Sequence, residues 1–173
     1  MGSAMSKEWL RKGMIIHTSV VAEGWSGIRW NEYYKSNKIL IRNGVREFLL
    51  SPRFVPSEKG TIYKIAIIDG RAFSSYSTRV TSEIRHRANL QKLITPPKYD
   101  VELLIEKKLR NQIKKMKLRD IVTMNKPIKD EYGTQCLICT DDPEENALIM
   151  QPAKFNDQWH PETGFAFIDS LQM

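Results

Sequence analysis

The sequence predicts an α+β fold with an antiparallel or mixed sheet, an N-terminal hairpin, two central amphipathic helices and a C-terminal β-meander. Three observations indicate this class. β-rich runs occupy both ends of the chain, two helical patterns adjoin in the middle, and strands do not alternate regularly with helices. Runs of strands with segregated helices are typical of α+β domains.

The N-terminal third is expected to be β-rich. Residues 12–22 contain two clusters of β-branched residues and are predicted to form a strand. Residues 24–34 are expected to form a loop rich in aromatic residues. Asn43-Gly44 lies between the β-prone runs 38–42 and 45–50, and both central residues of a type I′ turn must tolerate positive φ. These two residues therefore predict a β-hairpin.

A central strand and a first helix are predicted next. Residues 61–69 form a nearly unbroken apolar run, as in a strand that is buried on both faces. The helix that follows ends before Pro96-Pro97, because proline cannot continue a helix. Its apolar stripe consists of Val80, Ile84 and Ala88, flanked by Leu90 and Ile94.

The second helix is expected to begin at Asp100, whose carboxylate is suited to cap free backbone N–H groups. Five apolar residues then fall within an arc of about 120°. They are Val101, Ile105, Leu109, Ile113 and Met116, and the cations on the opposite side are Lys107, Arg110, Lys114 and Lys117. The pattern predicts one face toward a core and one toward water or an anion.

Short strands are predicted again in the last third. Residues 134–140 and 147–151 are expected to pair around an acidic turn at 141–146, and residues 164–169 to form a final strand. The acidic turn lacks the alternating oxygen ligands and the glycine of a calcium loop, so we expect a solvated hairpin tip.

The chain is expected to be one domain. Residues 1–5 are interpreted as a remnant of recombinant expression, because Met5 offers a second start, which leaves residues 6–173 as a single α+β domain. No run reaches the ~20 apolar residues of a membrane span and no charged-then-apolar leader is present, so neither membrane insertion nor secretion is expected. The use of only two cysteines favours a reducing cytoplasm.

Charge divides the domain into a basic helical part, residues 71–119, and an acidic β-rich tail, residues 126–173. Residues 71–119 hold 13 Lys and Arg against 4 Asp and Glu, whereas residues 120–173 hold 3 against 10. Such asymmetry indicates contact with a polyanion, or an acidic segment that shields or mimics one. The alternative is a pair of surface helices with solvated cations.

The leading hypothesis is a non-enzymatic nucleic-acid-associated or regulatory protein, with DNA or RNA as partner. Cations on one face neutralise neighbouring phosphates and release counterions, and the short Pro-Pro turn would bring the two helical faces together. Unpaired bases are also expected to stack on the aromatic loop, unless its rings are buried. The predicted nucleic-acid-binding residues are Arg79, Arg85, Arg87, Lys92, Lys107, Arg110, Lys114, Lys117, Trp25 and Trp30.

No metal site, cofactor or catalytic residue is predicted. Cys136 and Cys139 lie three residues apart in an expected strand, so their thiols are predicted to point to opposite faces as buried free cysteines. Glu106-Lys107-Lys108 matches the E-x-K element of metal-dependent nucleases, but the helical periodicity opposes that interpretation. The three histidines are scattered at His17, His86 and His160.

Two other functions stay open. A protein-interaction module, such as a small inhibitor or adaptor, would use the acidic tail or exposed aromatic rings on a partner protein. A nucleic-acid-processing or transferase enzyme would need a pocket that gathers His17 and acidic or serine side chains around Trp25.

Overall fold

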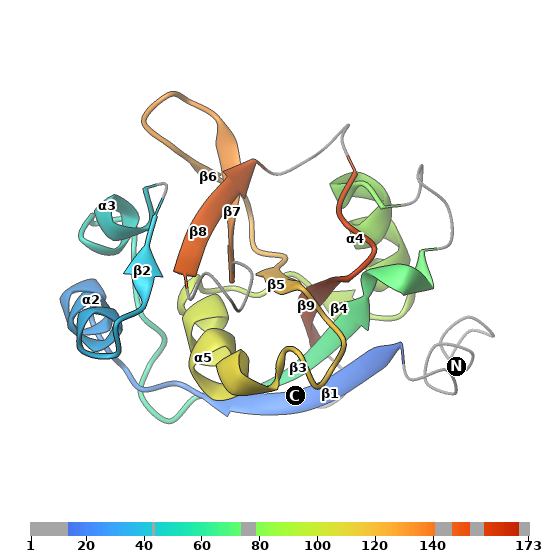
Figure 1. Cartoon of the computed structure of the whole chain (residues 1–173), viewed down its shortest axis with the longest axis horizontal. Helices are drawn as coiled ribbons and strands as arrows, with labels where there is room; N and C mark the ends of the chain where they lie inside the picture. Colours follow the sequence, from blue (N-terminus) through green and yellow to red (C-terminus); the bar gives the residue numbers. More distant parts are fainter. Residues whose placement is uncertain (1–13, 43, 74–78, 141–146, 153–157, 170–173) are drawn as a thin grey trace.

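The structure is a computed structural model that describes residues 14–42, 44–73, 79–140, 147–152 and 158–169, and it confirms the α+β class (Figure 1). Within these ranges the helices are α2 (Gly27–Ser36), α3 (Val45–Leu49), α4 (Thr81–Leu90) and α5 (Asp100–Leu109), with 3₁₀ turns η1 (Gly70–Ala72) and η3 (Arg110–Gln112). The strands are β1 (Ile15–Val21), β2 (Leu40–Ile41), β3 (Ile62–Asp69), β4 (Leu93–Ile94), β5 (Asp120–Thr123), β6 (Ile128–Lys129), β7 (Gln135–Thr140), β8 (Ala147–Pro152) and β9 (Thr163–Asp169).

All these strands belong to one mixed sheet in the order β1-β3-β9-β5-β7-β8-β2, with β4 beside β9 and β6 beside β7. The predicted pairing of β7 with β8 is confirmed and is antiparallel. The final strand, however, does not extend that pair as a meander. β9 inserts between β3, to which it is antiparallel, and β5, to which it is parallel. Every residue of β9 is buried, as suits a strand in the middle of a sheet.

The predicted hairpin at Asn43-Gly44 is wrong. Gly44 does adopt a positive φ of 86°, but it is the N-cap residue of the helix α3, and β2 pairs in parallel with β8. Val45, Phe48 and Leu49 are buried. Their spacing of three and four residues places them on one side of a helix, so tertiary burial outweighs the local β propensity of this run.

The expected aromatic loop at residues 24–34 is also wrong, because most of it lies in α2. Ser26 caps this helix, its hydroxyl oxygen accepting a 3.2 Å hydrogen bond from the Arg29 backbone N–H. Gly27 lies against α3, and a Cβ at this position would stand 1.6 Å from the Leu49 carbonyl oxygen. The absence of a side chain at Gly27 therefore allows α2 and α3 to pack together.

The sheet separates two apolar cores. Ile65 and Ile67 of β3 belong to one core with α2, α3 and α5, whereas Ala66 and Ile68 belong to the other with α4. This division follows from the alternation of side chains along a strand. In Figure 1, α2 and α3 lie beside β2, the end strand of the sheet, at the left of the view, whereas α4 lies at the right, where it contacts β4 beside β9.

Candidate nucleic-acid interface

The two basic helices lie on opposite faces of the sheet. Ile84 and Ala88 of α4 pack in the core that contains Ala66, whereas Val101 and Ile105 of α5 pack in the other core. The Pro96-Pro97 turn therefore joins helices that the sheet separates. Their cations do not form the continuous surface on which the sequence-based hypothesis depended.

The arginines around α4 are used inside the fold. Arg79 is 8% exposed, and its Nε and Nη1 donate to the carbonyl oxygens of Trp159 and Phe73 at 3.2 and 3.1 Å. Arg85 donates to the carbonyl oxygens of Met124 and Asn125, and burial lowers the pKa of its guanidinium. These two side chains hold the chain around β5 and Trp159, so we do not assign them to a ligand.

The other two predicted cations of this region are nearer to solvent. Arg87 forms an ion pair with Glu83 at 2.9 Å, in the i, i+4 arrangement of a helix surface. Lys92 is exposed just after α4, where its φ of 62° lies in the left-handed region. Neither residue adjoins a cation of α5 across the sheet.

The aromatic rings predicted to stack on bases mainly pack on one another. Trp30 is 1% exposed and lies 4.8 Å from Trp25, centroid to centroid. The half-buried ring of Trp25 is also covered by cations, with Arg29 at 4.8 Å and Lys107 at 5.3 Å from its centroid. Base stacking on Trp30 is therefore ruled out by burial, and Trp25 serves as a platform for the protein's own cations.

The first half of α5 is buried on all sides, which the amphipathic pattern did not predict. Residues 101–106 are all buried, including Glu102 and Glu106 at 0% and 1% exposure. The Thr123 hydroxyl donates to Glu102, and Arg110 Nε donates to Glu106. Burial raises the pKa of Glu106, with Arg110 opposing it, and raises that of Glu102 well above its ordinary value.

Asp100 does not cap α5 as predicted. The helix is preceded by Tyr99, and the Asp100 carboxylate instead accepts hydrogen bonds from the backbone N–H and the hydroxyl of Ser57, both at 2.8 Å. The residue is 1% exposed. Its role is thus to fasten the loop before β3 to the start of α5.

The cations that follow Glu106 remain at the surface. Residues 107–119 contain seven Lys and Arg and no carboxylate. Of these seven, only Arg110 is partly buried, whereas Leu109, Ile113 and Leu118 turn inward. We call the six exposed cations of this stretch the basic segment: Lys107, Lys108, Lys114, Lys115, Lys117 and Arg119.

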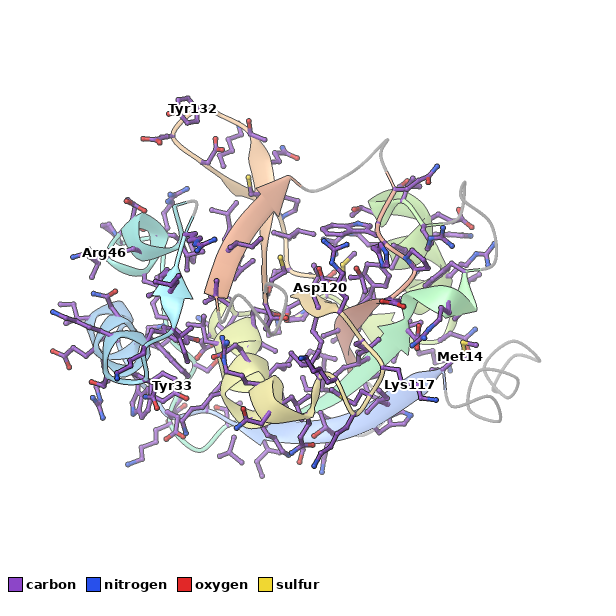
Figure 2. All side chains as sticks on the ribbon, viewed as in Figure 1. Met14, Tyr33, Arg46, Lys117, Asp120 and Tyr132 are labelled. Carbon is purple, nitrogen blue, oxygen red and sulfur yellow. The ribbon has the colours of Figure 1, made fainter. Side chains whose placement is uncertain are left out.

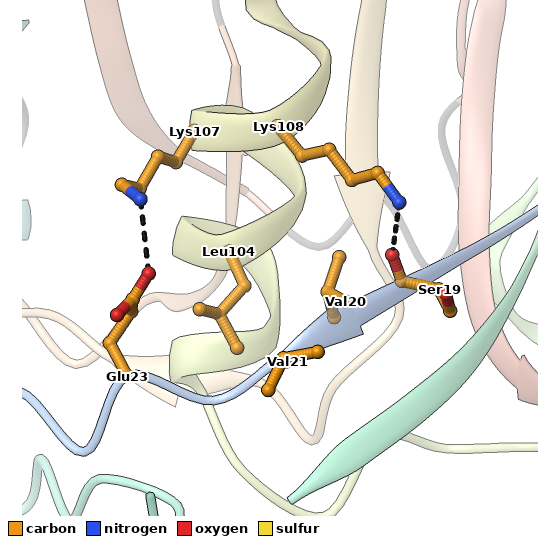
Figure 3. A pocket seen from close by; sticks show the side chains of 7 residues that line it. All are labelled: Ser19, Val20, Val21, Glu23, Leu104, Lys107 and Lys108. Carbon is orange, nitrogen blue, oxygen red and sulfur yellow. Dashed lines mark hydrogen bonds and ion pairs between the residues drawn. The ribbon is translucent and has the colours of Figure 1, made fainter. Parts of the chain in front are cut away.

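The first two lysines of the basic segment reach down on either side of a hollow of 360 Å³ between α5 and β1 (Figure 3). Lys107 Nζ lies 3.0 Å from a carboxylate oxygen of Glu23, and Lys108 Nζ donates to the Ser19 carbonyl oxygen. The ion pair is a third exposed on both sides, so its contribution to stability is small and its ammonium can be shared with an anion.

The other four cations lie on the turn that leads from η3 to β5, which the fold holds in place. The Lys117 carbonyl oxygen accepts a hydrogen bond of 2.8 Å from Arg71 Nη2. The Arg119 backbone N–H donates to the Glu162 carbonyl oxygen at 2.9 Å. Lys114 and Lys117 were among the predicted binding residues, whereas Lys108, Lys115 and Arg119 were not. Counting charge along residues 107–119, without assuming a continuous helix, would have found them.

The remaining candidate residues do not assemble into a second chemical site. Cys136 and Cys139 are buried and form no disulfide within the described residues, and they lie in opposite cores as predicted. His17 Nδ1 lies 3.7 Å from Asp169 Oδ2, and Glu83 pairs with Arg87 rather than with His86. Among the residues that the structure describes, no group of three or more His, Cys, Asp or Glu could hold a metal ion. The acidic turn at 141–146 lies outside those residues.

An enzyme was expected to have a pocket that gathers His17 around Trp25, but these two residues are not brought together. Trp25 packs against the core of α2 and α5, whereas His17 pairs in register with Ala66, whose side chain faces the α4 core. The two residues thus belong to different faces of the sheet.

Comparison with known proteins gives no further guide to function. No protein family matches the sequence, and no curated protein or solved structure matches the chain. No helix within the described ranges is long and apolar enough to cross a membrane.

Proposed function

We propose that this protein binds nucleic acid through the phosphate backbone, with the basic segment as its contact surface. The observation that carries the proposal is the exposure of six cations within residues 107–119, a stretch with no carboxylate. Backbone phosphates are closely spaced, and each one that a cation neutralises releases counterions. The proposal keeps Lys107, Lys114 and Lys117 from the sequence-based set and omits the arginines of the α4 region.

The exposed side chains of the basic segment are lysines apart from Arg119. Lysine supplies a point charge without the fork geometry that reads guanine edges. Binding is therefore expected to depend on salt far more than on sequence. A regulatory role would follow from where the nucleic acid is bound, not from catalysis.

Charge reversal provides the test. The double variant Lys114→Glu and Lys117→Glu is compared with Lys126→Glu and Lys129→Glu, which makes the same change at exposed lysines between β5 and β7. Fluorescence anisotropy with 20-nucleotide DNA and RNA, single-stranded and duplex, is measured from 50 to 200 mM salt. The first variant should lower the log–log salt slope by about one for each contact removed.

The control variant should weaken binding only slightly, because it changes the net charge but not the contact surface. Equal losses in the two variants would show attraction by overall charge, and would remove the basic segment from the proposal. Unchanged binding in the first variant, or no binding by the wild-type protein at 50 mM salt, would refute the proposed function. Thermal melting of each variant shows whether it is folded.

A further inference from the structure

We propose that a second site, a hollow between α2, β2 and α3, binds a small phosphorylated molecule with an apolar part. The hollow has a volume of 420 Å³ and is lined by Asn31, Lys35, Lys38, Ile39, Leu40, Ile41 and Arg46. Sites for small ligands range from about 300 to 1,000 Å³. The inference does not depend on nucleic-acid binding by the basic segment, because different residues carry it.

The charges in the hollow are all positive. Lys35 lies in the last turn of α2, Lys38 follows its C-cap residue, and Arg46 belongs to α3. No carboxylate lines the hollow, and neither Lys35 nor Arg46 has an ion-pair partner among the described residues. Cations from three positions around one concavity suit a phosphate monoester, whose oxygens accept from several donors at once.

The floor of the hollow is apolar. Leu40 is 50% exposed although it belongs to a strand, and Ile41 beside it is half-buried. β2 is the end strand of the described sheet, and just after it the Arg42 N–H donates to the Leu148 carbonyl oxygen of β8. Alternation along a parallel strand then directs the Ile41 N–H away from β8, toward the outer edge. The apolar part of a ligand can pack on Leu40 while a polar atom of the ligand accepts a hydrogen bond from the Ile41 N–H.

The hollow is separate from the basic segment. Asn31 and Lys35 share one face of α2, whereas Tyr33, whose ring lies 5.9 Å from Lys107 Nζ, points roughly 160° away from Lys35. Figure 2 shows the same separation, with Arg46 and Lys117 on different sides of the molecule. A ligand in the hollow and a strand on residues 107–119 do not compete for the same cations.

The conformation of Lys38 allows a clean test. Its φ is 56°, and its position closes α2 with a hydrogen bond from the Ile39 N–H to the Tyr34 carbonyl oxygen at 2.9 Å. Glycine adopts this left-handed conformation without the steric cost that a side chain incurs. Lys38→Gly therefore removes a cation from the hollow and keeps a backbone conformation that glycine adopts readily.

The probes are inorganic pyrophosphate and adenosine monophosphate, titrated by calorimetry and by NMR of the amides of residues 31–46. The wild-type protein should bind one equivalent of each, and the apolar floor should make the nucleotide the tighter ligand. Lys38→Gly and Arg46→Gln should each weaken binding about tenfold, the size of one charge-assisted hydrogen bond. Lys117→Gly and Lys129→Gln, which remove cations elsewhere, should leave binding unchanged.

Three outcomes would overturn the site. Absence of saturable binding at 10 mM of either probe would mean that the hollow is only a surface depression. Equal losses in Lys129→Gln would show general attraction by charge. Displacement of the nucleotide by a saturating DNA oligonucleotide would assign the hollow to the nucleic-acid surface, whereas simultaneous binding supports two sites. Failure of the oligonucleotide itself to bind would leave this inference standing and refute only the proposed function.

Discussion

Helices α4 and α5 are both ten residues long, both adjoin cations in the sequence, and both carry a glutamate four residues before an arginine. In α4 this pair is Glu83 with Arg87, whose side chains are 36% and 24% exposed. In α5 it is Glu106 with Arg110, at 0% and 16%. The same sequence pattern thus gives a surface ion pair in one helix and a buried ion pair in the other.

The difference teaches where positive charge is available to a ligand. Around α4, Arg79 and Arg85 donate hydrogen bonds to backbone carbonyl oxygens. Their positive charges therefore lie inside the fold and are not presented to a ligand. Around α5 the carboxylates are buried and the lysines that follow them are exposed. The net charge of a sequence segment therefore overestimates the positive charge that is exposed around α4. For the residues that follow Glu106 in and after α5, it gives the exposed positive charge correctly.

The largest expected effect separates the two ion pairs directly. Glu106→Ala leaves the largely buried Arg110 guanidinium without its carboxylate, and should lower the free energy of unfolding by about 3 kcal/mol. Glu83→Ala breaks the partly exposed pair and should cost about 0.5 kcal/mol. Both variants exchange Glu for Ala within a helix, so helix propensity cancels. Urea denaturation measures the difference, and equal costs would mean that α5 is not buried as described.

The strands of this fold follow from the sequence more directly than its helices do. Residues 61–69 were identified as a central strand because an apolar run of that length buries both faces. The burial of Glu102 and Glu106 was missed because a carboxylate counts as polar until a partner is known. Their partners are Thr123, 21 residues from Glu102, and Arg110, whose own placement depends on the packing of α5. The contact of Glu102 with Thr123 leaves no local pattern, whereas the spacing of Glu106 and Arg110 is visible in the sequence but the burial of this pair is not.

α2 was missed for a different reason, since its signals were present. Ser26 is a residue type that caps helices, and Trp30, Tyr33 and Tyr34 are spaced as on one side of a helix. Grouping the aromatic residues as a possible base-stacking loop hid that spacing. For the candidate interface, local counting was sufficient to find the charge of residues 107–119, but only the fold showed that the sheet separates it from α4.

An intermediate effect is expected from pH. Burial raises the pKa of Glu102 well above its ordinary value, so the folded protein holds this proton more tightly than the unfolded chain. The resulting stability is complete below the pKa of an unfolded glutamate, about 4.3, and is lost as the pH rises through the folded value. Glu102→Gln keeps a neutral side chain of the same size. Its stability should match that of the wild-type protein near pH 4 and exceed it increasingly as the pH rises.

Denaturation curves at one-unit steps from pH 4 to 8 measure this divergence. Glu83→Gln is the matched replacement on α4, where the carboxylate is partly solvated and paired with Arg87. A constant separation between Glu102→Gln and the wild-type protein would contradict the account, as would the same divergence in Glu83→Gln. Either result would mean that the burial of Glu102 does not govern the pH dependence.

The smallest effects concern the lysines that follow the two helices. Lys92 after α4 and Lys117 after α5 have φ angles of 62° and 59°. The backbone N–H of Lys92 donates to the Asn89 carbonyl oxygen and that of Lys117 to the Lys114 carbonyl oxygen, at 2.9 Å each. Glycine tolerates this conformation, so Lys92→Gly and Lys117→Gly should each change stability by only about 0.5–1 kcal/mol, in the stabilising direction.

Nucleic-acid affinity should respond differently, because only Lys117 belongs to the basic segment. Lys117→Gly should lower the salt slope by about one and Lys92→Gly should leave it unchanged. A loss of affinity in a variant that melts no lower than the wild-type protein cannot come from unfolding, so this pair tests the assignment of the surface independently of the fold.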